Sequence, residues 1–227
     1  MKSLLPTLAL TAAAAVAFVA PSADAGSNAN TYYLHGYGGL AKTHTYVHDD
    51  VTITAHATAK DPKTNKTYKH NVYVGQYSNG LGVSNSVYRN KWGQLRSNDG
   101  SHTVDGKGYD DTLWLSFTNP FKITGAVFNY VGKYYDDVKV VDGDGKSLGW
   151  FNLSRIANKW GQAHLDLSGL DYSGTTIGFA AVGNHDSFKV KAVKGHVVPT
   201  PSAAAAGLLG LAALTARRRR QTEEAEA

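Results

Sequence analysis

The chain of 227 residues contains no cysteine, which excludes a disulfide framework, thiolate metal sites and a cysteine nucleophile. Charged side chains make up only 18% of the chain, against roughly 25% in average soluble domains, so this is not a disordered acidic or basic protein. Residues 26–198 also lack glutamate. Their 14 acidic residues are all aspartate, against 18 lysines and arginines, a net charge of +4. Residues 26–198 therefore cannot supply a cysteine or glutamate side chain to a catalytic or metal-binding site.

Helical patterning is also missing between residues 26 and 198, where no window longer than ten residues is convincingly amphipathic. Apolar and polar residues instead alternate with the period of two that is typical of half-buried strands, at 51–58, 113–117 and 188–192. Further strands are predicted at 72–74, 123–130, 138–141 and 175–182. Turn sequences separate them, among them Asp61-Pro62, Asn119-Pro120 and Asp142-Gly143-Asp144-Gly145. The sequence predicts an all-β fold, an antiparallel β-sandwich of jelly-roll type.

The amino terminus has the features of an export signal. Lys2 precedes an apolar run from Leu4 to Ala20, and Ala23-Asp24-Ala25 supplies small residues at the expected cleavage positions. We expect residues 1–25 to form a signal-peptide helix that signal peptidase removes after Ala25. The alternative, a buried helix or a retained anchor, fits the polar stretch 26–30 less well.

The carboxyl terminus carries a second apolar segment. Ser202–Ala216 is uncharged and rich in alanine, leucine and glycine, and four arginines and a polar tail, 221–227, follow it. Its 15 residues are short for a membrane-spanning helix, which needs about 20, but arginines can snorkel to cover the difference. With the amino end exported, the positive-inside rule keeps the arginines cytoplasmic. We expect a short transmembrane helix that holds the chain transiently in the inner membrane.

The order of the parts in residues 199–220 resembles the PEP-CTERM sorting signal. The proline motif Val198-Pro199-Thr200-Pro201 comes first, then the short apolar helix, then the cluster Arg217, Arg218, Arg219 and Arg220. The common pattern has glutamate between the prolines, where this chain has Thr200. The resemblance implies that an exosortase cuts near the proline motif and transfers the protein to the cell envelope or releases it into the extracellular matrix. The alternative is a single-pass anchor that is never cut.

Residues 71–201 are similar to the exosortase-dependent surface proteins. The motifs that carry this similarity are Gly80-Leu81-Gly82-Val83, the His102-to-Asp105 segment and the strand Leu113–Phe117. Where that group commonly has asparagine after the motif aspartate, this chain has Gly106. The resemblance implies a surface domain, at residues 26–198, without an established catalytic activity.

Aspartates gather between residues 99 and 111, beside several glycines. Oxygen-rich loops of this kind can hold Ca²⁺, which takes six to eight oxygen ligands. A structural Ca²⁺ site is one hypothesis, and turn formation by the same aspartates and glycines is the other. The candidate ligands are Asp99, Asp105, Asp110 and Asp111. No other cofactor is expected.

Exposed aromatic rings could bind sugar rings by stacking. The candidates are Trp92, Trp114 and Trp160, with a structural role in the core as the alternative. Trp114 alternates with two leucines and is expected on the opposite face of its strand. The pentapeptide Asn90–Gln94 recurs as Asn158–Gln162, which indicates two equivalent loops before strands, a shared turn geometry or a coincidence.

No combination of residues predicts an enzyme. Ser101, His102 and Asp105 are the only hydrolase candidates, and no nucleophile elbow or phosphate-binding loop is present. Nucleic acid is not expected as a partner, because the arginine cluster is explained by sorting. The sequence therefore predicts a non-enzymatic surface or matrix protein. The alternatives are a carbohydrate-binding module that acts on envelope glycans or exopolysaccharide and, less favoured, a hydrolase of matrix polymer.

Overall fold

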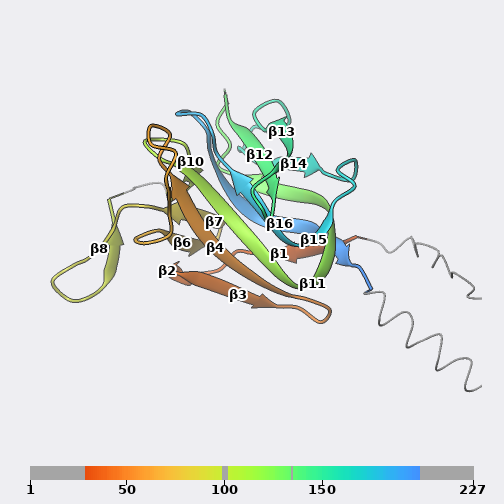
Figure 1. Ribbon diagram of the computed structural model, residues 1–227, viewed down its shortest axis with the longest axis horizontal. Helices are drawn as coiled ribbons and strands as arrows, with labels where there is room; N and C mark the ends of the chain where they lie inside the picture. Colours follow the sequence, from red (N-terminus) through yellow and green to blue (C-terminus); the bar gives the residue numbers. More distant parts are fainter. Residues whose placement is uncertain (1–28, 99–101, 134, 200–227) are drawn as a thin grey trace, which may run out of the picture.

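The computed structural model describes residues 29–98, 102–133 and 135–199, and all regular structure within these ranges is β-strand (Figure 1). The predicted all-β fold is confirmed for this part of the chain. The expected signal-peptide and C-terminal helices lie outside the described residues. Within them, no helix has the length and apolar character needed to cross a bilayer. The strands are β1 (Asn30–Tyr33), β2 (Gly39–Ala41), β3 (Thr43–Val47), β4 (Thr52–Lys60), β5 (Thr67–Tyr68), β6 (Tyr73–Tyr77), β7 (Gly80–Ser84), β8 (Val87–Arg89), β9 (Leu95–Ser97), β10 (Val104–Asp105), β11 (Asp110–Asn129), β12 (Asp137–Asp142), β13 (Ser147–Asn152), β14 (Ala163–Asp166), β15 (Ser173–Ala180) and β16 (Ser187–Val197).

The strand β11 organises a large antiparallel sheet. Its first half pairs with β4 on one side and β15 on the other, and β12 and β13 continue the sheet beyond β15. Its second half pairs with β16 and β14. Strand β16 pairs in turn with β1 and β7, and β6 and β2 extend this part of the sheet. A single strand therefore belongs to two differently paired halves of the sheet.

The turn predicted at Asn119-Pro120 is wrong, because β11 continues through it. In Figure 1 the strand bends sharply instead of ending. The pairing with β15 shifts register between Ser116 and Phe121, and the exposed Thr118 and Asn119 lie in the interval. Proline has no N–H to donate, so it is tolerated where the ladder is interrupted. The proline thus marks a change of partners and not the end of a strand.

Both halves contribute side chains to one hydrophobic core among the described residues. Leu113, Leu115 and Phe117 alternate inward from the first half of β11, as their period of two predicts. Phe128 from the second half contacts Phe179 of β15 edge to face, with ring centroids 5.5 Å apart. Burying each of these side chains contributes roughly 1.5–3 kcal/mol to the stability of the folded protein. The core therefore links the two halves of the sheet.

The motif Gly80–Val83 forms most of β7, in which every residue is buried. Gly80 has a φ of +126°, which favours glycine, at the turn that joins β6 to β7. A Cβ built on Gly82 would overlap the carbonyl oxygen of His102 and lie 2.6 Å from its carbonyl carbon. The glycines are thus explained by a backbone conformation and by a close backbone approach.

Candidate functional site

An open pocket of about 660 Å³ lies beside the loop that precedes β14. Trp160 forms part of its wall and is 81% exposed, and Tyr130, with a φ of +62°, is also exposed. The pocket combines two aromatic rings with primary amides, the side chains that bind sugar rings and hydroxyl groups respectively. Its principal lining side chains are Asn79, Asn129, Tyr130, Asn158, Trp160 and Gln162.

Hydrogen bonds hold the amides of this pocket in place. The Gln162 Nε2 atom donates to Asn129 Oδ1 at 3.2 Å, and Asn129 Nδ2 donates to the carbonyl oxygen of Asn79 at 2.8 Å. The Lys189 ammonium lies 4.7 Å from the centroid of the Tyr130 ring and 3.4 Å from Asn79 Oδ1. The polar side of the pocket is therefore preorganised, which lowers the entropy cost of binding a ligand there.

The repeated pentapeptide adopts one geometry in both places. Asn158 Oδ1 accepts from the backbone N–H groups of Trp160 and Gln162 at 2.9 and 3.1 Å. Asn90 Oδ1 makes the corresponding bonds to Trp92 and Gln94, both at 3.0 Å. The glycine of each copy has a positive φ, and each copy immediately precedes a strand. Both copies therefore form the same turn, one leading into β9 and the other into β14.

The loop geometry also explains why both indoles are exposed. Asparagine, glycine and the backbone close the turn, which leaves the lysine and tryptophan side chains outside it. Lys91 Nζ lies 4.4 Å from the Trp92 ring centroid, and Lys159 Nζ lies 5.0 Å from that of Trp160. Each loop thus displays a cation–π pair. Trp92 lies in the turn of the β8–β9 hairpin, which forms a two-stranded sheet of its own, whereas Trp160 lies in the loop before β14.

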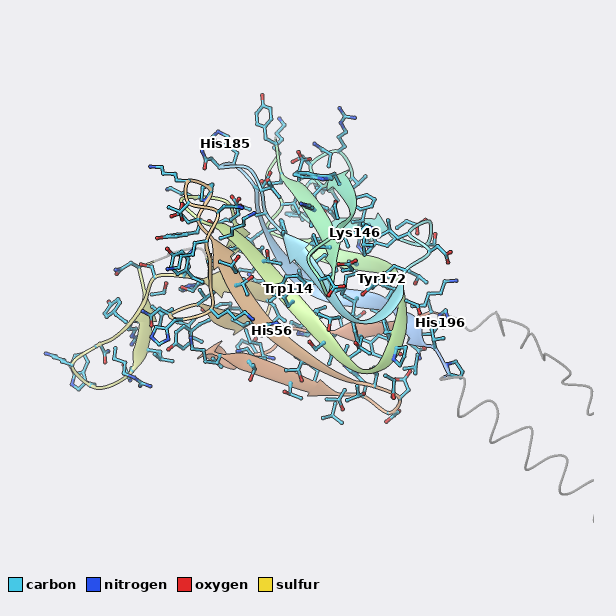
Figure 2. All side chains as sticks on the ribbon, viewed as in Figure 1. His56, Trp114, Lys146, Tyr172, His185 and His196 are labelled. Carbon is cyan, nitrogen blue, oxygen red and sulfur yellow. The ribbon has the colours of Figure 1, made fainter. Side chains whose placement is uncertain are left out.

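Trp114 lies on the outer face of the sheet, as its alternation with leucines predicts, but it is half-buried. Its Nε1 donates to Thr58 Oγ1 at 2.9 Å, and its ring lies nearly parallel to that of His56 on β4, with centroids 6.3 Å apart (Figure 2). A Cβ on Gly178 would come within 2.9 Å of the indole, so glycine leaves room for the ring above β15. A depression of about 360 Å³ beside it is lined by Lys60 and Lys139 among others.

Two of the aspartates proposed for Ca²⁺, Asp105 and Asp111, have protein hydrogen-bond partners. Asp105 accepts from the Thr103 hydroxyl at 3.2 Å and from the Lys107 N–H at 3.0 Å. Asp111 is buried and accepts from Asn85 Nδ2 at 3.0 Å. Burial raises the pKa of Asp110. Asp99 lies outside the described residues.

Residues 29–98, 102–133 and 135–199 contain no group of three or more His, Asp or Glu side chains placed to hold a metal ion. Asp142 closes the predicted turn, because its Oδ1 accepts from the N–H groups of Asp144 and Lys146. The turn-forming interpretation of this aspartate therefore accounts for its contacts.

Two buried aspartates, Asp136 and Asp186, form a pair that the sequence does not reveal. Asp136 Oδ1 accepts from the N–H of Ser187 at 3.0 Å, and Asp186 Oδ1 accepts from the N–H of Asp137 at 2.9 Å. The two carboxylates thus join the beginnings of β12 and β16 reciprocally. Burial raises the pKa of Asp136 to about 6, although N–H donors from Gly132 and Ser187 oppose that rise. No local pattern could reveal the pair, because its members are 50 positions apart.

Two of the three hydrolase candidates, His102 and Asp105, lie within the described residues. The His102 ring stacks on Tyr77, with centroids 5.4 Å apart, while Asp105 makes the contacts given above. Ser101 lies outside the described residues. At the sorting motif, the Val198 N–H donates to the carbonyl oxygen of Pro120 at 2.7 Å, and Pro199 is exposed. Thr200, Pro201 and Arg217 to Arg220 lie beyond the described residues.

The chain matches no family model and no curated protein. Its function therefore has to be inferred from its own residues and from the geometry of the described domain.

Proposed function

We propose that this chain is a non-enzymatic exported protein of the cell surface or extracellular matrix, whose β-domain binds neutral glycan in the Trp160 pocket. The observation that carries the glycan-binding part is the combination of a highly exposed indole with amides held by hydrogen bonds in one open pocket. The two halves of the sheet enclose one core, which favours a β-sandwich of jelly-roll type. Sandwich domains commonly bind their ligands with the loops at the ends of the strands.

The sorting part of the proposal rests on the two terminal segments. Signal peptidase would release residues 1–25, and an exosortase would act near the proline motif after transient insertion in the inner membrane. The described domain is compatible with both cuts. Strand β1 begins at Asn30, and the last backbone hydrogen bond of the domain involves Val198. Removal of both termini would therefore take no strand from the sheet.

Processing can be tested by the intact mass of the protein from its native host. We expect the mature protein to lack residues 1–25 and the apolar segment with its arginines, and to occur in envelope or matrix fractions. Replacing Arg217 to Arg220 by glutamines should leave the apolar segment uncut or the protein mislocalised. These arginines are expected to fix the orientation of the segment in the membrane. A full-length protein of 227 residues in the soluble interior would contradict the proposal.

Binding can be tested on an array of neutral oligosaccharides. We expect Trp160→Ala to raise the Kd by about tenfold or more. Truncation of an aromatic anchor can remove about 2 kcal/mol of binding free energy. Asn129→Ala should also weaken binding, since it breaks the bonds to Gln162 and Asn79.

Trp92→Ala is the matched control, because Trp92 occupies the same loop geometry in the β8–β9 hairpin and does not line the pocket. It should leave neutral-glycan binding unchanged. Equal losses in the two tryptophan variants would show that the pocket does not determine binding. Retention of full binding by Trp160→Ala would remove this site from consideration.

A further inference from the structure

The β8–β9 hairpin is a two-stranded sheet of its own, and Figure 1 shows it projecting at one end of the molecule. Residues 87–97 contain three cationic side chains and no aspartate or glutamate. Two aromatic rings are exposed on it, Trp92 at 73% and Tyr88 at 48%. The hairpin therefore concentrates positive charge and aromatic surface on one small element. The cationic residues are Arg89, Lys91 and Arg96.

The second copy of the loop shows what is particular to this hairpin. Both copies present a lysine over a tryptophan in the same turn. Arg89 and Arg96 flank the first copy, whereas Ala157 and His164 stand at the corresponding positions of the second. Arg89 Nη1 donates to the carbonyl oxygen of Gly93 at 2.6 Å, and Arg96 Nη2 donates to Gln94 Oε1 at 3.1 Å. The guanidinium groups are thus held at the loop that carries Trp92.

We infer that the β8–β9 hairpin is a docking element for an acidic polysaccharide, separate from the neutral-glycan pocket at Trp160. Guanidinium groups bind carboxylates through paired hydrogen bonds, and an indole face stacks on a sugar ring. A chain of carboxylated sugars supplies both features at short, repeated spacing. The net charge of residues 26–198 supports the same class of ligand, and an exposed cationic element speeds encounter with a polyanion.

A bilayer surface fits the hairpin less well. The tip of the loop, residues 90–94, places only one apolar side chain among asparagine, lysine, glycine and glutamine. Stable interfacial binding depends on the apolar area buried among the lipids, which one indole provides poorly. A single indole is sufficient to stack on one sugar ring of a carboxylated polysaccharide, so this ligand does not require a larger apolar surface on the hairpin.

The test measures binding of the mature protein, purified from its native host, to polygalacturonate, with dextran as the uncharged probe and phosphatidylglycerol vesicles as the membrane probe. We expect Lys91→Gln/Arg96→Gln to weaken polygalacturonate binding by about tenfold, since each lost ion pair contributes a few-fold. Trp92→Ala should weaken it by a similar factor. Wild-type binding should fall as salt is raised, because exposed charges are screened.

Lys159→Gln is the matched control, because it removes the equivalent charge from the second loop. It should leave the affinity for polygalacturonate unchanged. Thermal unfolding should be the same in all variants, since the hairpin does not pair with the large sheet. The inference is overturned if Lys159→Gln causes an equal loss, or if the hairpin variants change binding to vesicles and not to polygalacturonate. Failure of dextran binding would count against the Trp160 pocket alone.

Discussion

Replacing Gly82 by alanine is expected to lower the free energy of unfolding by about 3 kcal/mol or more, the upper range for overpacking a core. The new methyl group would overlap the carbonyl oxygen of His102 and lie 3.1 Å from the Cα of Thr103. Both neighbours are backbone atoms, so no side-chain rotation can relieve the overlap. The Val83 N–H also donates to the Thr103 carbonyl oxygen at 3.3 Å, which keeps the two segments together.

Gly169→Ala is the control for this substitution. A Cβ at Gly169 meets no atom within 4 Å, so the change should alter stability by no more than about 0.5 kcal/mol. Urea denaturation followed by tryptophan fluorescence gives both values. Equal stability of the two variants would mean that β7 and the segment at His102 do not approach each other as the structure shows.

The second large effect concerns the pH dependence of stability at Asp136. Burial raises the pKa of this carboxyl from 3.8 to about 6 in the folded protein. The folded state therefore holds the proton more tightly than the unfolded state. The stabilisation is complete below pH 3.8 and is lost as the pH rises through about 6. The difference between the pKa values of the unfolded and folded states corresponds to roughly 3 kcal/mol, most of it between pH 6 and 4.

Comparison with Asp136→Asn isolates this group, because the variant cannot titrate there. The stability of the wild type relative to the variant should rise by about 2.5 kcal/mol when the pH falls from 7.5 to 4. The titration of Asp110, whose pKa burial also raises, then largely cancels, because Asp110 does not act on the carboxyl of Asp136. The titration of His56 cancels too. Burial lowers its pKa, so its contribution is lost as the pH falls.

Asp166→Asn is the control for the pH experiment. The Ser168 N–H lowers the pKa of this exposed carboxyl, so its contribution is present above its ordinary value and is lost only at lower pH. Its stability difference from the wild type should stay flat between pH 7.5 and 5. A flat difference for Asp136→Asn over the whole range would contradict the raised pKa.

Much of the strand content could be predicted from local sequence. The alternation in 51–58 corresponds to β4, where Ile53, Ala55 and Ala57 are buried, and the alternation in 113–117 lies within β11. A period of two is a local property of the chain, so no knowledge of partners is needed to find it. The sequence predicts two strands, at 113–117 and 123–130, where the structure has the single strand β11. Asn119-Pro120 is as suitable for a bend within a strand as for a turn between strands.

The sequence left open whether Trp160 and Trp92 are exposed or in the core, and the turn that each pentapeptide forms decides for exposure. The amides that line the pocket beside Trp160 could not be predicted either. Asn79 and Asn129 reach the pocket from other elements, and only the pairing of strands brings them there. Trp114 was placed on the correct face, but its contacts with Thr58 and Gly178 depend on the neighbours that β4 and β15 supply.

Local sequence was sufficient to predict the β-rich character of the domain and the alternation of its strands, because both follow from spacing over a few residues. Which residues meet across the chain depends on the three-dimensional fold. Examples are Gly82 against His102 and Asp136 against Ser187. Contacts between distant segments depend on the register of whole strands, and local spacing carries no information about that register.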